Sequence, residues 1–403
     1  MLFKPAFEYF YGRNRSIRAV SLNIMYLKKL TLLHFKNYPE VELTFCNRVN
    51  CFTGNNGEGK TNVLDAIHYL SFCKSFFNPI DSQNILHDAP FMLVQGIYSL
   101  NDTDEEIYCG LKRNQKKQFK RNKKEYQRLA DHIGLFPLVM ISPADSELIS
   151  EGSESRRRFI DSVIAQYDKE YLDSLITYNK ILSHRNALLK QFSKRGTFDK
   201  ESLEIWDIQL VEHGIKIHEK RKNFIGKFIP IFQKYYELIS GGREQVSIEY
   251  DSHLNENEFS LKLEKAIERD RILEHTTVGI HKDELEFLIN GYPLKKYASQ
   301  GQQKSFLIAL KLAQFDFIKN IKNTTPILLL DDIYDRLDDL RIKQLMKLVC
   351  SNNFGQLFIT DTHPTRLATL FKESEVSFKI FNIANGKATE NKDEKSLELQ
   401  KHE

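Results

Sequence analysis

One eight-residue run constrains the fold of this chain more than any other feature. It contains three glycines and ends in lysine and threonine: Gly54-Asn55-Asn56-Gly57-Glu58-Gly59-Lys60-Thr61. A short strand pattern over 49–52 precedes the run and a helical pattern over 61–73 follows it, which is the context of a phosphate-binding loop. Glycine lets the backbone wrap a triphosphate, the lysine neutralises the outer phosphates, and the threonine hydroxyl can bind Mg²⁺. The run therefore predicts an α/β protein with ATP and Mg²⁺ as cofactors.

A second run, far along the chain, ends in two acids. Residues 327–330 are continuously apolar, as in a parallel strand buried on both faces, and Asp331 and Asp332 follow directly. We expect Asp331 to hold Mg²⁺ together with Thr61, and Asp332 to orient or deprotonate the attacking water as the catalytic base. The alternative is that the two acids only cap a helix. Asp335-Arg336-Leu337-Asp338 follows, and Asp338 is a further candidate for nucleotide binding.

A third run, Ala298-Ser299-Gln300-Gly301-Gln302-Gln303-Lys304, precedes a strong amphipathic helix pattern. It resembles the signature motif of ABC-type ATPases, although Gln300 stands where transporters usually have glycine. The resemblance implies that Ser299 reaches the γ-phosphate bound by a second copy, with Gln300, Gly301 and Gln302 beside it, and hence a homodimer closed by ATP. The alternative is an ordinary serine that caps a helix.

Further stretches resemble the RecF family of bacterial recombination and repair ATPases. They lie at 25–38, 153–161, 178–190 and 279–283. The resemblance implies an ABC-type ATPase head, built from a mixed sheet with helices, and a largely helical inserted second lobe. It also implies that His363 is a catalytic switch histidine that reaches the γ-phosphate. Alternatively, Thr362 or His363 caps a helix that begins at Pro364.

The RecF resemblance also implies a function. The protein would dimerise on ATP, bind gapped DNA at junctions of single and double strands, and hydrolyse ATP weakly with stimulation by DNA. It would act in recombinational repair, replication restart and the SOS response, with RecO and RecR as partners and RecA loading as the indirect result. An SMC-like structural chromosome ATPase is the alternative. That class needs long heptad arms, and breaks at Gly196, Pro230 and 241–242 argue against them.

The pattern of strands, helices and charged runs divides the chain into parts. We expect an ATPase lobe over 25–112 and 276–385, and a basic, mostly helical second lobe over 113–275. Residues 1–24 are an extension, either disordered or lying before the true start, and the charged tail over 386–403 is expected to be disordered. Within the lobes, strands are predicted over 91–100 and 105–112, a long helix over 203–239, and a hairpin turn at Asn290-Gly291.

Affinity for DNA has to come from local clusters of charge, because the net charge is only +4. Residues 112–128 hold nine Lys or Arg and one Glu, and a second cluster lies over 156–158. Clustered cations bind phosphates without regard to sequence. The run could equally be a solvated hairpin, and the arginines could be paired with Glu154 or Asp161. The DNA-binding candidates are Lys116, Lys117, Lys120, Arg121, Arg156, Arg157 and Arg158.

Three remaining observations concern location and one unassigned group. Five cysteines without a CxxC pair favour a reducing cytoplasm. We find no convincing signal peptide and no apolar run long enough to span a bilayer, so no membrane association is expected. The glutamine that senses the γ-phosphate in ABC-type ATPases could be Gln83 or Gln95, and the sequence does not separate them.

Overall fold

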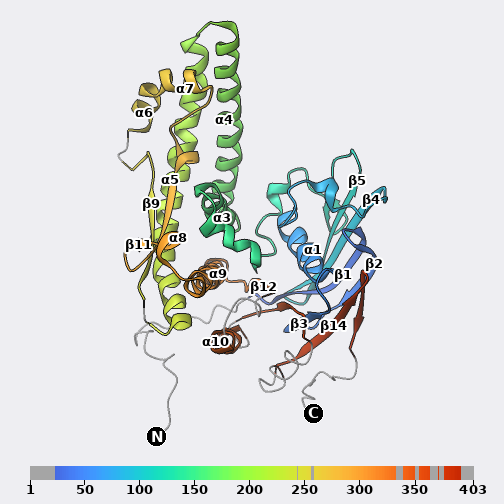
Figure 1. Ribbon diagram of the computed structural model, residues 1–403. Helices are drawn as coiled ribbons and strands as arrows, with labels where there is room; N and C mark the ends of the chain where they lie inside the picture. The colour runs from blue at the N-terminus through green and yellow to red at the C-terminus, as the bar shows by residue number, and fades with distance from the viewer. Residues whose placement is uncertain are drawn as a thin grey trace.

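The computed structural model describes residues 23–242, 244–255, 258–332, 339–349, 354–363, 371 and 376–391. Figure 1 shows two parts: a sheet-rich part around α1, and a part dominated by the long helices α4 and α5. This is the mixed α/β head with a helical insertion that the sequence predicts. No described helix is long and apolar enough to cross a bilayer.

The first sheet of the sheet-rich part is antiparallel, with strand order β2-β1-β4-β5-β6-β7. Side chains of β1 alternate toward the core, as expected for a sheet with one buried face. Strands predicted over 91–100 and 105–112 are confirmed. The bounds are Met25–Phe35 (β1), Tyr38–Thr44 (β2), Phe91–Leu100 (β4), Thr103–Lys112 (β5), Gln118–Arg121 (β6) and Lys124–Glu125 (β7).

The second sheet is mixed, with order β15-β14-β3-β13-β12-β8, and only the β14–β15 pair is antiparallel. Strands β3 and β12 are buried at every position, which explains the continuous apolar sequence of β12. Strand β3 also buries the polar side chains of Asn50 and Thr53. Helix α1 (Lys60–Phe72) contacts strands of both sheets, and its buried apolar side chains belong to the same hydrophobic core as theirs. The strand bounds are Val49–Thr53 (β3), Leu138–Ile141 (β8), Ile327–Leu330 (β12), Leu357–Asp361 (β13), Phe378–Ala384 (β14) and Lys387–Glu390 (β15).

The helical part is built on α3 (Ser153–Ala165), α4 (Lys169–Arg195) and α5 (Lys200–Ser240). Gly196 ends α4 in the left-handed conformation, as the break predicted there requires. Pro230, by contrast, does not interrupt α5, which continues for 41 residues. The break predicted at Pro230 is therefore wrong, since packing of the helix outweighs the local cost of the proline.

Smaller elements connect these layers. A three-stranded antiparallel sheet, β11-β10-β9, covers α5, and α9 packs against α5 through Phe306 and Phe232, whose ring centroids are 4.7 Å apart. The bounds are Val246–Asp251 (β9), Glu284–Ile289 (β10), Tyr292–Pro293 (β11), Glu147–Ser150 (α2), Phe259–Lys265 (α6), Ile267–Leu273 (α7), Leu294–Tyr297 (α8), Gln300–Lys322 (α9) and Asp339–Val349 (α10). Short 3-10 turns cover Asp81–Asn84, Leu129–Asp131, Pro143–Ser146 and Ile280–Lys282.

The observed layers shift the predicted lobe boundaries. Strands β6, β7 and β8 belong to the two large sheets, although the boundary at 113 assigns them to the helical lobe. Strand β10 pairs with β9, so the boundary at 276 cuts through one sheet. Strand pairing decides both cases, since β6 pairs with its neighbour β5, and β8 and β9 pair with the distant strands β12 and β10. The change in charge and helical pattern along the sequence does not reveal these pairs.

The expected disordered tail also begins too early. Strand β15 pairs with β14 from Ala384↔Lys387 to Phe381↔Glu390. The turn between them is Asn385-Gly386, with φ values of 50° and 67°, the combination that a two-residue hairpin favours. At the other end, Asn23 bridges to Thr324, so the described chain starts within the predicted extension.

Candidate nucleotide site

The phosphate-binding loop connects the carboxyl end of β3 to α1. Gly54, Gly57 and Gly59 have φ values of 146°, 86° and 111°, which side chains other than glycine rarely adopt. A Cβ at Gly54 would lie 2.2 Å from the carbonyl oxygen of Ile383, and one at Gly59 would lie 2.4 Å from the Asn37 side chain. The loop is therefore glycine-rich for both conformational and steric reasons.

The lysine of the loop is held by the loop itself. The Lys60 ammonium donates to the carbonyl oxygens of Gly54 (2.8 Å) and Asn55 (2.9 Å) and is almost fully buried. Two residues from the β1–β2 hairpin fasten the other side of the loop. The Asn37 amide donates to the Glu58 carbonyl (2.8 Å), and the Tyr38 hydroxyl donates to the Gly59 carbonyl (2.9 Å). Asn56 is exposed at the tip of the loop.

Thr61 and the acidic strand meet, as the sequence predicts. The Thr61 hydroxyl lies 2.9 Å from Oδ1 and 3.1 Å from Oδ2 of Asp331, although 270 residues separate them. Burial raises the pKa of Asp331 to about 6, against hydrogen bonds from Thr360 and Thr61 that lower it. Because proximity of a cation favours the charged form, this carboxylate is suited to a site that receives a positive ion.

The donor set fits Mg²⁺ bound together with a nucleotide. No group of three or more His, Cys, Asp or Glu side chains within the described residues could hold a metal alone. Mg²⁺ does not need one, because it commonly combines one or two protein oxygens with substrate phosphates and water. The Thr61 hydroxyl and the Asp331 carboxylate are the residues that would hold it.

Asp332 follows with a left-handed backbone, at φ 45°. Its N–H donates to the Thr360 hydroxyl at 2.9 Å, and its side chain is half-buried. A cavity of about 310 Å³ borders Asp331 and extends to Ser142, Asp145 and Lys304. The site therefore has two neighbouring carboxylates, those of Asp331 and Asp332, and adjoining space.

The signature-like run forms the start of α9. Ser299 is the N-cap of this helix: its hydroxyl accepts from the Gln302 N–H, and its own N–H donates to the Gln302 side chain at 2.6 Å. Ser299 and Gln300 are exposed, and Gln302 also donates to Glu244. A Cβ at Gly301 would lie 2.8 Å from an Arg341 nitrogen. Ser299 therefore caps α9 and is at the same time exposed, so its capping role does not exclude contact with a second molecule.

The remaining nucleotide candidates are placed unequally. His363 is exposed, its N–H donates to Oδ1 of Asp361 at 3.0 Å, and its ring Nδ1 lies 2.8 Å from the Thr362 hydroxyl. Asp338 and Pro364 lie outside the described residues. Gln95 donates to Glu106 on the neighbouring strand, and Gln83 is exposed, so neither is brought to the loop by a hydrogen bond.

The basic run over 112–128 is only partly available to a ligand. Lys117 donates to the Cys73 carbonyl and to Asp81, and Arg121 forms a two-pronged ion pair with Glu105, at 2.8 Å for both bonds. Lys120 lies over the Tyr108 ring, whereas Lys116 is exposed. Two of the four candidates, Lys117 and Arg121, therefore have acidic partners.

The arginine cluster on α3 is likewise divided. Arg156 donates to the carbonyl oxygens of Leu148 and Glu151, and Arg157 donates to that of Asp283 at 2.6 Å. Arg158 pairs with Glu154 at 3.2 Å and stays largely exposed. Pairing with Glu154, which the sequence left open, thus occurs. Asp161 pairs instead with an arginine that no sequence motif singles out.

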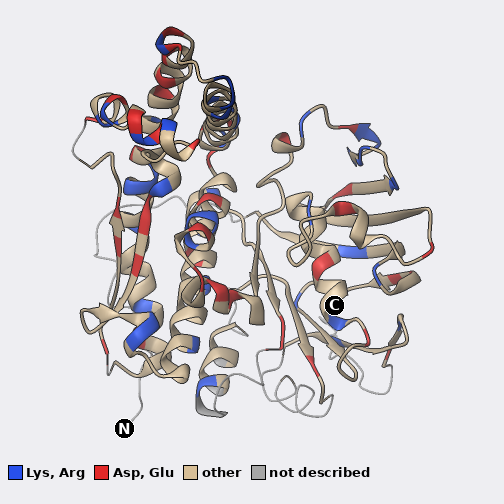
Figure 2. Ribbon diagram, turned by 45° about the horizontal axis from the view of Figure 1, so that its top comes forward, with Lys and Arg blue, Asp and Glu red and all other residues tan. Residues whose placement is uncertain are grey.

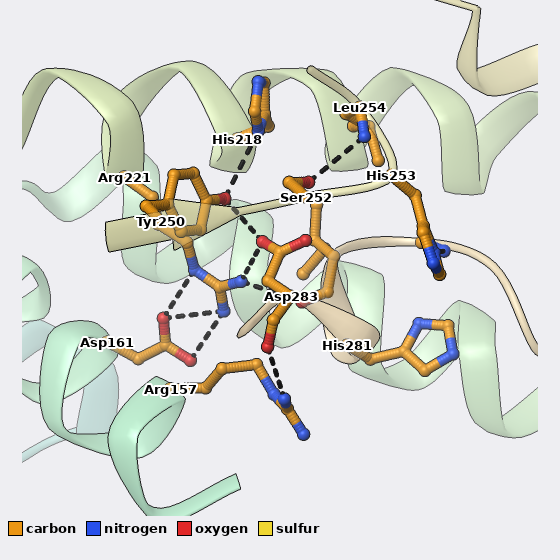
Figure 3. A network of polar contacts seen from close by, with 12 residues as sticks. Arg157, Asp161, His218, Arg221, Tyr250, Ser252, His253, Leu254, His281 and Asp283 are labelled. Carbon is orange, nitrogen blue, oxygen red and sulfur yellow. Dashed lines mark hydrogen bonds and ion pairs between the residues drawn. The ribbon is translucent and has the colours of Figure 1, made fainter. Parts of the chain in front are cut away.

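That arginine, Arg221 on α5, lies at the centre of the network in Figure 3. It donates to both oxygens of Asp161, at 2.9 and 3.0 Å, and to Oδ2 of Asp283 at 2.8 Å. Its side chain is 2% exposed and that of Asp283 is fully buried. The network joins the run over 153–161 to the run over 279–283. Two stretches that resemble one family therefore meet around a buried charge.

Comparison with known proteins agrees with this geometry. The family model described as the RecF/RecN/SMC N terminal domain matches residues 26–389. The DNA replication and repair protein RecF of Phocaeicola vulgatus is 52% identical over 371 residues, covering 92% of this chain and 99% of that protein. A solved structure of "the recombination mediator protein RecF-ATPrS in RecFOR pathway" is 32% identical, with a TM-score of 0.83, and covers 92% of this chain and 99% of that one.

A more distant likeness bears on the SMC alternative. The Smc head domain of Pyrococcus furiosus, solved with an extended coiled coil, has a TM-score of 0.55 at 17% identity, covering 91% of this chain and 96% of that one. At that identity the likeness shows a shared head fold and nothing about function. By its family model, its relatives and its fold, the chain belongs to the RecF family of DNA replication and repair proteins.

Proposed function

We propose that this protein is a DNA-stimulated ATPase that dimerises on Mg·ATP and binds gapped DNA. The observation that carries the proposal is the contact between Thr61 and Asp331, which joins the phosphate-binding loop to the acidic strand at 2.9 Å. A phosphate-binding loop by itself could bind many different phosphate-containing ligands. Here the hydroxyl of Thr61, at the start of α1, contacts the buried carboxylate of Asp331, and this pair supports binding of a metal–nucleotide complex.

Each residue of the site has one role in the proposed reaction. The loop N–H groups and Lys60 hold the phosphates, and Thr61 with Asp331 hold the metal. Mg²⁺, when bound, supplies positive charge that stabilises the phosphoryl group during transfer. Asp332 takes the proton of the attacking water, and His363 donates a hydrogen bond to the γ-phosphate. Release of the proton, of phosphate and of ADP then resets the site.

The second half of the nucleotide site comes from another copy of the chain. Ser299 and Gln300 are exposed at the start of α9, where helix N–H groups favour an anion. The hydrogen bonds of Ser299 stay within its own helical turn. In a symmetric pair, each serine would complete the site formed by the phosphate-binding loop of the partner. ATP would thus act as the link between the two subunits.

We infer the DNA-binding surface from the exposed lysines that form no ion pair within the described part of the chain. Lys116, Lys123 and Lys124, at the hairpin that carries β6 and β7, are exposed and form no ion pair among the described residues. On α4, no Asp or Glu occurs from residue 174 to the end of the helix at Arg195, and Lys180, Lys190 and Lys194 are exposed at helical spacing. They span about 21 Å at 1.5 Å per residue. In Figure 2, basic segments gather at both places.

These two surfaces refine the candidates taken from the sequence. Lys116 remains a candidate for DNA binding, and Lys120 and Arg158 are secondary candidates. The other four, Lys117, Arg121, Arg156 and Arg157, are assigned a structural role because they bond to groups of the protein. Exposed lysines without partners bind phosphates regardless of base sequence, since the gain comes from release of counterions. We propose that the substrate is gapped DNA with its single-strand to double-strand junction.

We place the protein in the cytoplasm, in recombinational repair, replication restart and the SOS response. One solved structure, whose match to this chain covers 99% of the solved chain, is described as a recombination mediator of the RecFOR pathway, and a second solved structure is described as RecF-ATP in that pathway. This supports RecO and RecR as partners of the present chain and RecA loading as the downstream step.

Sedimentation velocity tests the proposal. With Mg·ATP the protein should sediment as a dimer, with ADP as a monomer, and with Mg·ATP plus gapped duplex as a faster complex. A monomer under all three conditions would contradict ATP-driven pairing. Equal affinity for gapped DNA in the presence of ATP and of ADP would contradict the coupling between ATP binding and DNA binding.

Three triple variants test the DNA surface. Lys116, Lys123 and Lys124 are replaced by Ala in the first, and Lys180, Lys190 and Lys194 in the second. The third is the matched control and replaces Lys200, Lys216 and Lys220, which pair with acids and change the net charge equally. The first two should flatten the salt dependence of DNA binding by about 0.9 log units for each phosphate that is no longer neutralised. If neither differs from the control, the surface lies elsewhere.

A further inference from the structure

Strand β13 lies between the two strands that carry the nucleotide site. The order β3-β13-β12 is parallel, so the carboxyl ends of all three strands meet at one edge of the sheet. The phosphate-binding loop follows β3, and Asp331 follows β12. Thr360, the penultimate residue of β13, is fully buried between them. Nothing in the sequence run Thr360-Asp361-Thr362 marked the first threonine as part of the site.

The Thr360 hydroxyl bonds to both acids of the site. It donates to Oδ1 of Asp331 at 2.9 Å, and it accepts the N–H of Asp332, also at 2.9 Å. A hydroxyl has one proton to donate and lone pairs to accept with, so the two bonds are compatible. The contact to the Asp332 carboxylate is longer, at 3.5 Å. The same oxygen therefore orients one carboxylate and holds the backbone of the next residue.

The second bond constrains an unusual backbone. Asp332 has φ 45°, a conformation that residues other than glycine adopt at some cost. A buried N–H without an acceptor would add to that cost. The Thr360 hydroxyl supplies the acceptor, and so helps fix the direction in which the Asp332 side chain leaves the strand. Asp331 in turn is held from two sides, by Thr61 and by Thr360.

We infer that Thr360 is a positioning residue of the ATPase site: its hydroxyl sets Asp331 for the metal and Asp332 for the water. This inference rests on the proposed function. Valine has nearly the shape of threonine but lacks the hydroxyl, whereas serine keeps the hydroxyl and lacks the methyl group. The two substitutions therefore separate hydrogen bonding from packing.

The test compares Thr360→Val, Thr360→Ser and Ile359→Val in the full chain. Ile359 is the buried neighbour on β13, and its shortening perturbs packing without touching the hydrogen bonds of the hydroxyl. Four quantities are measured: kcat and KM for DNA-stimulated ATP hydrolysis, the half-saturating Mg²⁺ concentration for binding of a fluorescent ATP analogue, and the melting temperature. The Mg²⁺ titration does not depend on turnover, so it reports the metal side of the site by itself.

Thr360→Val should lower kcat at least about tenfold, as expected for removal of a hydrogen bond to a charged group. It should also raise the half-saturating Mg²⁺ concentration, with a smaller change in KM. Thr360→Ser should restore both quantities to within about threefold, and Ile359→Val should lower the melting temperature without changing either.

Two results would overturn the inference while the parent protein is active. In the first, Thr360→Val keeps the kcat and the Mg²⁺ dependence of the parent. In the second, Thr360→Ser is as impaired as Thr360→Val, which would make the methyl group the important part. A parent that binds no Mg·ATP and hydrolyses none overturns the proposed function, and this inference falls with it.

Discussion

Replacing Arg221 by methionine tests how much the buried network contributes to stability. The substitution keeps the length of an unbranched side chain but removes the charge. Asp161 would keep the Tyr171 hydroxyl and is 17% exposed, so water can reach it. Asp283 is fully buried, would keep only the Tyr250 hydroxyl on Oδ2, and already has no partner for Oδ1. The main cost is thus an unpaired charge on Asp283.

The expected decrease in stability is about 3–5 kcal/mol, the range found when one partner of a buried ion pair is removed. At a urea slope of about 3 kcal/mol/M, the unfolding midpoint would fall by roughly 1–2 M. The only tryptophan, Trp206, lies on the same helix and stacks on His184 of α4 with ring centroids 5.0 Å apart. Its fluorescence therefore reports unfolding of the helical part.

The matched control is Lys216→Met, which is also on α5. Lys216 is exposed and pairs with Glu212 one turn away, so its removal should cost less than about 1 kcal/mol. A second variant, Arg221→Met with Asp283→Asn, removes the orphaned charge as well. It should recover about 2 kcal/mol relative to the sum of the two single changes. If Arg221→Met has the same urea midpoint as Lys216→Met, the network contributes little stability. If the effects of Arg221→Met and Asp283→Asn simply add, the two residues are not coupled.

Three further predictions concern the nucleotide site. Lys60→Ala should abolish dimerisation by Mg·ATP, because the outer phosphates lose their neutralising charge; an ATP-dependent dimer in sedimentation would refute this. Asp332→Asn should keep ATP binding and accumulate the closed dimer while turnover falls about 10²-fold or more, and parental turnover would exclude the base role. Gly54→Ala should abolish binding of a fluorescent ATP analogue, since its Cβ would lie 2.2 Å from the Ile383 carbonyl. Unchanged analogue binding would show that the loop can relax.

Local sequence predicted the elements that form the candidate nucleotide site. The loop from Gly54 to Thr61 is contiguous, and its function depends on residue types that neighbour one another in the chain. The strand ending at Asp331 could likewise be read from its apolar run. The pairing of Thr61 with Asp331 could be expected only because both patterns belong to one known kind of site.

Contacts that depend on the fold were not predictable in this way. Thr360 approaches Asp331 because β13 inserts between β3 and β12, and strand order is not written in any one stretch. Arg221 is one of many basic residues in α5, and nothing in its neighbourhood singles it out as buried. The hairpin at Asn385-Gly386 is different: its sequence carried the same turn signal as Asn290-Gly291, and the surrounding charges obscured it.

The basic run shows the limit of composition. Nine cations within 112–128 suggested a single DNA-binding surface, yet Lys117 and Arg121 are held by Asp81 and Glu105. Asp81 lies outside the run, and Glu105 lies on the neighbouring strand. Charge counts along a sequence therefore do not separate free cations from paired ones, and the distinction requires the three-dimensional fold.

The central claim is that two copies of the chain build each nucleotide site together. Mixing Ser299→Arg protein with Lys60→Ala protein tests it most directly. Each variant alone lacks one half of both sites and should hydrolyse almost no ATP. A mixed dimer holds one site with an intact loop and an intact serine, so the mixture should regain part of the parental ATPase activity. If the mixed dimer is shown to form by crosslinking and no activity returns at any ratio, Ser299 does not act across the dimer.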